Sequence, residues 1–251
     1  MAGGEAVGMI EVSALTEHAD LVEAVRLQKE IWGFSEIELL PVRLFVVATK
    51  VGGQVFGAFD GSRMIGFLLA IPGIKPGGKS YLHSHMMGVL AEYRNRGVGR
   101  LLKLAQRNDA IKTGVNLIEW TFDPLELKNA FFNIERLGAI VRRYVPNQYG
   151  TTTSHLHGGL PTDRCVAEWH VSSIRVADIL SGERADEDIE ARIEVPEAIA
   201  QWRIHEPKRA REEQQRIGED FINYFRQGLA VVGFERGEAA GSYLLGTWQS
   251  D

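Results

Sequence analysis

Residues 93–102 read Tyr93-Arg94-Asn95-Arg96-Gly97-Val98-Gly99-Arg100-Leu101-Leu102, and this stretch decides the fold. It follows a mostly apolar run, Tyr81–Leu90, that predicts a strand, and it leads into Val98–Ala110, whose apolar residues recur at helical spacing. The two glycines therefore lie where a strand becomes a helix. Glycine lets a ligand approach the backbone, and the first amides of a helix have no partners within it. With three arginines in the same stretch, this turn is suited to binding an anion such as a polyphosphate.

Two common phosphate-binding patterns do not fit this turn. A dinucleotide fingerprint would need a third glycine at Leu102, and a P-loop would need Gly-Lys followed by Ser or Thr. The pattern that fits is Arg-x-x-Gly-x-Gly directly after a strand, here Arg94, Gly97 and Gly99. It resembles the acyl-CoA pyrophosphate loop of the GCN5-related N-acetyltransferase (GNAT) superfamily. An ordinary glycine-rich turn is the alternative.

The segments after this helix extend the resemblance. Leu117–Phe122 predicts a second strand, and a helix from about Pro124 ends at Leu137-Gly138, where the glycine favours a C-cap. In the superfamily these elements form the second half of the CoA site. The resemblance covers residues 9–173 and implies the GNAT fold. That fold is of the α/β (α+β) class, with a central mixed, mostly antiparallel twisted sheet flanked by helices.

Within the superfamily the chain is most similar to a bacterial group of predicted acyltransferases, through His83-Ser84-His85-Met86-Met87-Gly88-Val89 and Gly159-Leu160-Pro161-Thr162-Asp163-Arg164. The resemblance implies acetyl-CoA or another acyl-CoA as co-substrate. It also implies a small-molecule primary amine as acceptor, with an amino acid as one candidate. The residues expected to hold the cofactor are Met87, Gly88, Val89, Arg94, Asn95, Arg96, Gly97, Val98, Gly99, Arg100, Asn129, Phe132 and Asn133.

Two histidines are candidates for the catalytic base. Amines with a pKa of about 8 to 10 are mostly protonated near neutral pH, so acyl transfer to nitrogen needs a base. His83 and His85 are two residues apart, and in a regular strand they would share a face with Tyr81 and Met87. His85 lies nearer the expected thioester, and imidazole suits proton transfer near neutral pH. Ordinary histidines on a sheet face are the alternative.

Glu119 and Tyr149 complete the candidate catalytic residues. Glu119 is a carboxylate in an otherwise apolar strand, where burial would raise its pKa, but an arginine partner would equally account for it. Many relatives carry a tyrosine general acid where this chain has Ile134, so Tyr144, Tyr149 or water would have to protonate the thiolate. Arg164 would suit an acceptor carboxylate, with a surface ion pair as its alternative.

Two other classes of function compete with acyl transfer. The pairs His83/His85 and His155/His157 would bind a metal such as zinc if they met in space. No carboxylate or cysteine has suitable ligand spacing, so no metal is expected. The second alternative is a module that binds acyl-CoA but has no turnover. Ile134 favours this alternative, because it stands where many relatives carry a tyrosine general acid.

The charge and the pattern of apolar residues argue against nucleic-acid and membrane partners. The net charge of −5 does not suggest binding to nucleic acid or to an anionic membrane. No apolar run approaches the roughly 18 residues of a membrane span, and Met1–Gly8 lacks the features of a signal peptide. The single cysteine, Cys165, cannot form an internal disulfide and is expected to fill a strand face rather than act as a nucleophile. These features favour a cytoplasmic enzyme.

The chain is expected to form a GNAT acyltransferase domain, residues 1–173, and a C-terminal α/β extension, residues 174–251. In the first part, Thr16 is expected to cap a helix ending at Trp32, and Asp60-Gly61-Ser62 predicts a hairpin turn. The extension predicts a strand, a charged helix broken near Pro207 and two final strands. It would serve as a packed subdomain, as an element forming a homodimer, or as a cover over the acceptor pocket.

Overall fold

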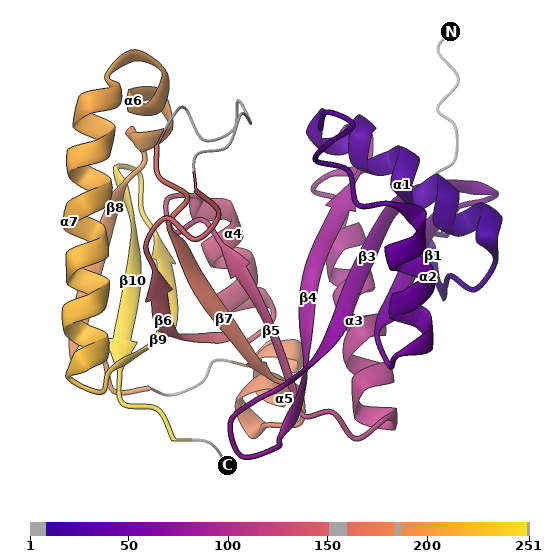
Figure 1. The fold of residues 1–251 in the computed structure, drawn as a ribbon. Coiled ribbons are helices and arrows are strands. Elements are labelled where there is room, and N and C mark those ends of the chain that lie inside the picture. The colour runs from indigo at the N-terminus through magenta and orange to yellow at the C-terminus, as the bar shows by residue number, and fades with distance from the viewer. Residues whose placement is uncertain (1–8, 151–159, 184–186, 250–251) are drawn as a thin grey trace, which may run out of the picture. The chain divides into compact units, whose positions relative to one another are not determined.

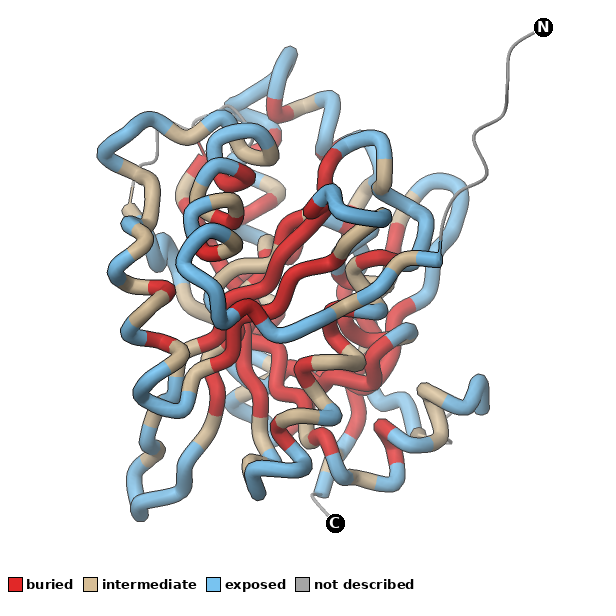
Figure 2. Tube along the Cα trace, turned by 90° about the vertical axis from the view of Figure 1, so that its right-hand side faces the viewer, coloured by how far each residue is buried: buried red, intermediate tan, exposed pale blue. Residues whose placement is uncertain are grey.

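The computed structural model describes residues 9–150, 160–183 and 187–249. The chain divides into two compact units, residues 1–118 and 119–251 (Figure 1). In both units strands form the interior layer and helices pack against it. Buried residues, red in Figure 2, lie mainly on the strands and on the inward sides of the helices.

The first unit is an antiparallel sheet with helices on both faces. Its strands follow one another in the order β1-β2-β3-β4, and Gly61, with a φ of 58°, forms the predicted hairpin turn between β2 and β3. The elements are β1 (Glu11–Ala14), α1 (His18–Trp32), α2 (Val42–Lys50), β2 (Gln54–Asp60), β3 (Arg63–Ile74), β4 (Ser80–Val89), the short 3-10 turn η1 (Ala91–Tyr93), α3 (Val98–Lys112) and the start of β5 (Leu117–Phe122).

Packing contacts assign the helices of this unit to the two faces. Trp32 of α1 and Phe45 of α2 both contact the Phe67 ring, so α1 and α2 cover the face of β3 that carries Phe67. Lys103 of α3 bonds to Ser84, which pairs with Ala70 on the other face of the same strand. The helix that begins at the glycine turn therefore packs on the opposite face from α1 and α2.

The second unit is built on a longer sheet with the strand order β5-β7-β6-β9-β10-β8. The pairings of β6 with β7 and β9, and of β10 with β9 and β8, are antiparallel. Besides the rest of β5, the elements are α4 (Leu127–Phe131), the π-helical turn η2 (Phe132–Arg136), β6 (Ile140–Val145), β7 (Arg164–His170), α5 (Ile174–Ser181), β8 (Ala191–Pro196), α6 (Ile199–His205), α7 (Pro207–Arg226), β9 (Ala230–Arg236) and β10 (Ala240–Gly246).

The C-terminal residues continue this sheet. β9 pairs with β6 through Val141 and Val231, and the Phe221 ring of α7 stacks on Tyr144 at 5.5 Å between ring centroids. The predicted helix break is confirmed, since α6 ends at His205 and Pro207 occupies the first turn of α7. The division between compact units falls at residue 118, and a separable extension beginning at residue 174 stays a prediction.

The expected mixed α/β class, with sheet flanked by helices, is confirmed. The expected cap at Thr16 is wrong, because α1 begins one residue later, with Glu17 at the N-cap and without a capping hydrogen bond from the Glu17 side chain. The helix expected from Pro124 begins at Leu127 and widens into η2. Across the described ranges, no helix combines the length and apolar character that spanning a membrane would take.

Candidate functional site

The glycine turn has an open, left-handed backbone. Gly97 is the N-cap of α3 with a φ of 82°, and Asn95 before it has a φ of 61°. The first helical bond runs from the Leu101 amide to the Gly97 carbonyl at 3.0 Å, so the amides between these residues precede the helical ladder. A Cβ on Gly97 would meet nothing within 4 Å. The positive end of the helix is therefore accessible to an anion.

Basic and aromatic side chains hold this turn in place. Arg94 donates from Nε to the Val89 carbonyl at 3.2 Å, and the Tyr93 hydroxyl donates to Asp60 at 2.8 Å. The Arg96 guanidinium lies over the Tyr93 ring, 5.4 Å from its centroid. Arg94, Asn95 and Arg96 are all exposed. The turn thus places cationic side chains beside the first amides of α3.

A β-bulge in β4 lies at His85. Leu69 of β3 pairs with Met86 and the adjacent Ala70 pairs with Ser84, which leaves His85 as the extra residue. This bulge breaks the alternation of faces. The expectation that Met87 shares a face with His83 is therefore wrong, because His83 pairs with Ile71 and Met87 with Leu68 on opposite faces of β3. Bulges commonly re-aim side chains beside active sites.

The two histidines of β4 lie close together. Their ring centroids are 5.9 Å apart. The residue His85 is exposed overall. Partial burial of its imidazole ring by neighbouring atoms nevertheless lowers the pKa of the ring below 6.5. A lowered pKa favours the neutral imidazole, which is the form that accepts a proton. His83 is half-buried beside it.

Lys103 of α3 lies next to the bulge of β4, and the sequence analysis did not identify it. It is 2% exposed and donates from Nζ to Ser84 Oγ at 2.9 Å and to Gln106 Oε1 at 3.0 Å. Burial lowers its pKa well below the usual lysine value. The signal was present in the helical pattern, since Lys103 and Gln106 fall on the inward side of α3 with Leu102 and Ala110.

In the second unit, the residues expected to contact CoA lie on α4 and η2. Asn133 is buried, and its Oδ1 accepts a hydrogen bond from Trp120 Nε1 at 3.2 Å. Asn129 is exposed and Phe132 is half-buried. Ile134, at the position of the usual tyrosine, is fully buried. Single π-helical turns often occur at functional sites, and η2 is such a turn.

Glu119 belongs to a network of two buried carboxylates and two arginines. It bonds to Arg143, and Glu168 of β7 bonds to Arg142 and lies 3.5 Å from Arg143. Burial alone would raise the pKa of Glu168, but the nearby His170 ring and the two guanidiniums outweigh it and lower the pKa to about 2. The arginine partner weighed for Glu119 is present, and its catalytic role stays a prediction.

The two candidate tyrosines differ in their hydrogen-bond partners and exposure. Tyr144 donates to Asp163 at 2.5 Å, and burial together with that carboxylate raises its pKa far above the usual range. Tyr149 is 48% exposed and its hydroxyl shares a hydrogen bond with Thr121 at 2.9 Å. Arg164 is buried, donates to the Asp163 carbonyl and lies over the Tyr149 ring at 5.5 Å. Burial raises the pKa of the Cys165 thiol, which keeps it protonated.

The rival metal site falls partly outside the described residues. His83 and His85 are adjacent in the first unit, whereas His155 and His157 belong to residues 151–159, which the structure does not describe. Elsewhere, among residues 9–150, 160–183 and 187–249, no three His, Cys, Asp or Glu side chains are grouped to hold a metal ion.

The first unit thus brings together β4 with its bulge, the histidine pair and the glycine turn of α3, in the order strand, turn and helix. No protein-family model matches the chain, and no curated protein matches it. Solved structures do match. The ribosomal-protein-S18-alanine N-acetyltransferase from Escherichia coli aligns over 73% of this chain and 100% of its own, with a TM-score of 0.51 and 18% identity.

A protein from Desulfovibrio desulfuricans, described as an acetyltransferase of the GNAT family, aligns over 65% of this chain and 100% of its own, with a TM-score of 0.50 and 14% identity. The chain has the GNAT fold. A third match to the GNAT fold, from Salmonella typhimurium, is described as an acetyltransferase solved with its cofactor acetyl-CoA. It covers 65% of this chain and 94% of its own, with a TM-score of 0.52 and 12% identity.

Proposed function

We propose that this chain is an acyl-CoA-dependent N-acyltransferase, with acetyl-CoA as the first donor to test and a small-molecule primary amine as acceptor. The observation that carries the proposal is the turn at Gly97, an open left-handed glycine at the N-terminus of α3 within a GNAT fold. Similar structures support it, since they include an N-acetyltransferase and a protein solved with acetyl-CoA.

In this proposal the amides of Val98, Gly99 and Arg100 hold the CoA pyrophosphate. The N–H groups of a helix's first turn point away from the helix, and together with the helix dipole they favour a doubly charged anion there. Asn95, Arg96 and the neighbouring Arg94 supply further polar and positive groups, although Arg94 already bonds to the Val89 carbonyl. That bond leaves Met87 and Gly88 as the better candidates for backbone contacts with the pantetheine. Asn129, Phe132 and Asn133 would complete the cofactor contacts from η2 and α4.

Acyl transfer would proceed directly in a ternary complex. The amine nitrogen attacks the thioester carbonyl carbon, the C–N bond forms as the C–S bond breaks, and CoA leaves as a thiolate. His85 takes the proton that the amine nitrogen loses, and its lowered pKa keeps the ring neutral for that role. His83, close beside it, is the second candidate for the same role.

The thiolate needs a proton that Ile134 cannot supply. Tyr149 is the better candidate donor. The Tyr144 hydroxyl already donates its hydrogen bond to the Asp163 carboxylate, whereas the Tyr149 hydroxyl shares its hydrogen bond with the Thr121 hydroxyl. Glu119 is a weaker candidate base, since its carboxylate would first have to leave Arg143. Amino acids are the first acceptors to test. In this proposal the enzyme acts in the cytoplasm, alone or as a homodimer, without nucleic acid, membrane or metal.

A second candidate function is acyl-CoA binding without turnover. The observation that favours it is Ile134, whose fully buried apolar side chain stands where many relatives have an acid. Such a module would keep the glycine turn and lose the chemistry.

The test separates binding from transfer. Calorimetric titration with CoA, acetyl-CoA and succinyl-CoA measures donor affinity, and free-thiol release is then followed with a panel of amines that includes the common amino acids. Saturable donor binding with amine-dependent thiol release supports the transferase. Binding without release across the panel supports the binding module. A folded protein that binds none of the three donors contradicts both.

A further inference from the structure

Lys103 of α3 is a buried side chain that the proposed reaction does not use. It is 2% exposed, and its Nζ donates to Ser84 Oγ at 2.9 Å and to Gln106 Oε1 at 3.0 Å. Ser84 is buried as well, with 6% exposed. A buried polar group costs free energy unless it is hydrogen-bonded, so the amine has to keep these partners. The bond therefore holds the Ser84 hydroxyl in one place against α3.

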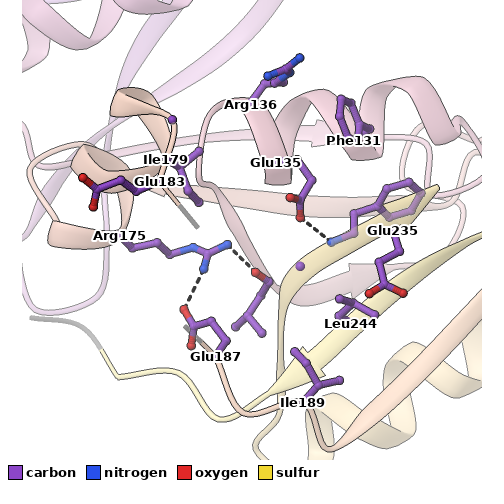
Figure 3. A pocket seen from close by; sticks show the side chains of 14 residues that line it. Phe131, Glu135, Arg136, Arg175, Ile179, Glu183, Glu187, Ile189, Glu235 and Leu244 are labelled. Carbon is purple, nitrogen blue, oxygen red and sulfur yellow. Dashed lines mark hydrogen bonds and ion pairs between the residues drawn. The ribbon is translucent and has the colours of Figure 1, made fainter. Parts of the chain in front are cut away.

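Lys103 differs from a buried arginine of the second unit. Arg175 of α5 lines a cavity of about 380 Å³, and its guanidinium is paired with the Glu187 carboxylate at 2.7 Å (Figure 3). Arginine stays charged, so its burial calls for an opposite charge. Lys103 bonds to two uncharged oxygens, and burial lowers its pKa well below 10.5. A lowered pKa favours the neutral amine, which acts as a hydrogen-bond donor rather than as a charge.

Ser84 is the residue next to the β-bulge. It pairs with Ala70 of β3, and the pairing of the two strands resumes at Met86. The strand ladder thus fixes the residues on both sides of His85 and leaves His85 itself as the extra residue. The direction of its ring depends on the backbone of the bulge. The bond from Lys103 adds a side-chain anchor at the residue just before it.

A second buried bond ties α3 to a different strand, β2. Gln54 is 5% exposed, and its Nε2 donates to the Gln106 carbonyl at 3.1 Å and to Asp109 Oδ2 at 2.8 Å. Buried hydrogen-bond networks of this kind hold packed elements rigidly together. The Gln54 bond docks the same helix on the sheet without involving the bulge, so it offers a matched comparison for the bond of Lys103.

We propose that Lys103 is a positioning residue for acyl transfer, which through its bond to Ser84 fixes the bulge of β4 and so the direction of the His85 ring. The catalytic consequence rests on the proposed function, whereas the setting of the ring can be measured without turnover. His83, with its ring centroid 5.9 Å from that of His85, is a titratable neighbour on the same strand. Across the bulge, Leu69 and Ala70 of β3 are uncharged.

The first measurement is an NMR titration of the His85 ring in the full chain, assigned by comparison with His85→Gln. Ser84→Ala and Lys103→Met break the same bond from opposite ends, and the double variant removes both groups. Because partial burial lowers the pKa of the His85 ring below 6.5, a loosened bulge should raise this pKa toward 6.5. We expect the same shift in the two single variants and in the double variant, since all three lack one and the same bond.

Gln54→Met is the matched control, because it breaks the bond between α3 and β2 and keeps the bond between Lys103 and Ser84. Its His85 titration is expected to match the wild type. An unchanged titration in Ser84→Ala, or an equal shift in Gln54→Met, would overturn the proposal. A shift in Lys103→Met alone would show that the lysine acts through its charge, and would overturn the proposal as well.

The second measurement separates positioning from binding. With an active donor and amine, Ser84→Ala and Lys103→Met should lower kcat about tenfold while the affinity for acyl-CoA stays unchanged. The acid limb of kcat/KM should move to higher pH together with the ring titration. An unchanged kcat beside a shifted ring titration would overturn the role of Lys103 in transfer. A chain that transfers no acyl group to any amine would contradict the proposed function, and the ring titration would still decide whether Lys103 positions His85.

Discussion

Lys103 of α3 donates a hydrogen bond to Ser84 of β4 at 2.9 Å, and both side chains are buried. Ser84 immediately precedes His85, the extra residue of the bulge. One buried bond thus ties the helix whose first turn is proposed to hold the pyrophosphate to the strand that carries the proposed base.

This buried lysine should make stability depend on pH. Its pKa lies well below 10.5 in the folded protein, so the unfolded chain binds a proton that the folded chain does not. Stability should therefore rise with pH, by about 1.4 kcal/mol per pH unit while Lys103 is neutral in the fold. Urea unfolding at about pH 8 and pH 9 measures the slope.

The Lys103→Met variant should lose that rise, because its side chain has no proton to release. Lys112→Met changes an exposed lysine of the same helix and should keep the wild-type slope. Equal slopes in the wild type and Lys103→Met would mean that Lys103 stays charged in the fold.

Glu168 should govern part of the acid stability. Its folded pKa of about 2 lies below the ordinary 4.5, so its contribution is present above pH 4.5 and is lost as the pH falls toward 2. Glu168→Gln should remove a contribution of about 3 kcal/mol at neutral pH and flatten the unfolding curve between these values. Unfolding followed by circular dichroism from pH 7 to pH 2 tests this.

The control for that experiment is Glu194→Gln, which neutralises an exposed carboxylate of β8. It should reproduce the wild-type acid limb. An unchanged acid limb in Glu168→Gln would show that Arg142 and Arg143 do not hold the carboxylate in its charged form.

Gly97→Glu should abolish binding of CoA, because it places a carboxylate where the pyrophosphate is proposed to lie. The matched control is Gly114→Glu at the other end of α3. Both glycines have a positive φ, 82° and 76°, and open space around the missing Cβ. Each change should cost about 1–2 kcal/mol of stability from left-handed strain. Calorimetry should find binding lost only in Gly97→Glu, and equal affinity in both variants would remove the turn from the site.

His85→Gln should lower kcat/KM by about a hundredfold if His85 is the base. In the wild type, kcat/KM should fall with acid only below pH 6.5, because the lowered pKa keeps the ring neutral down to that point. The variant should lack that acid limb while CoA affinity stays unchanged. His83→Gln is the comparison, and an equal loss in the two variants, or no loss in either, would count against His85 as the base.

Local patterns predicted most of the elements. The glycine turn, the Asp60-Gly61 hairpin and the break at Pro207 rest on backbone preferences of single residues, so they could be seen in the sequence. The bulge at His85 could not, because the extra residue is defined only by the pairing of β4 with β3. The face assigned to Met87 was wrong for that reason.

The bonding partners of the buried side chains could not be predicted from the sequence either. Glu119 bonds to Arg143, 24 residues away, and Lys103 bonds to Ser84, 19 residues away. Periodicity marks Lys103 as inward-facing on α3 but does not say what it meets. The sequence by itself predicted the order of strand, glycine turn and helix around Gly97 and suggested that this turn binds an anion, because both inferences follow from local conformation and charge. The tertiary structure alone decided which histidine is re-aimed, which carboxylates are neutralised by arginine and where a cavity forms. Those features depend on contacts between residues far apart in the chain.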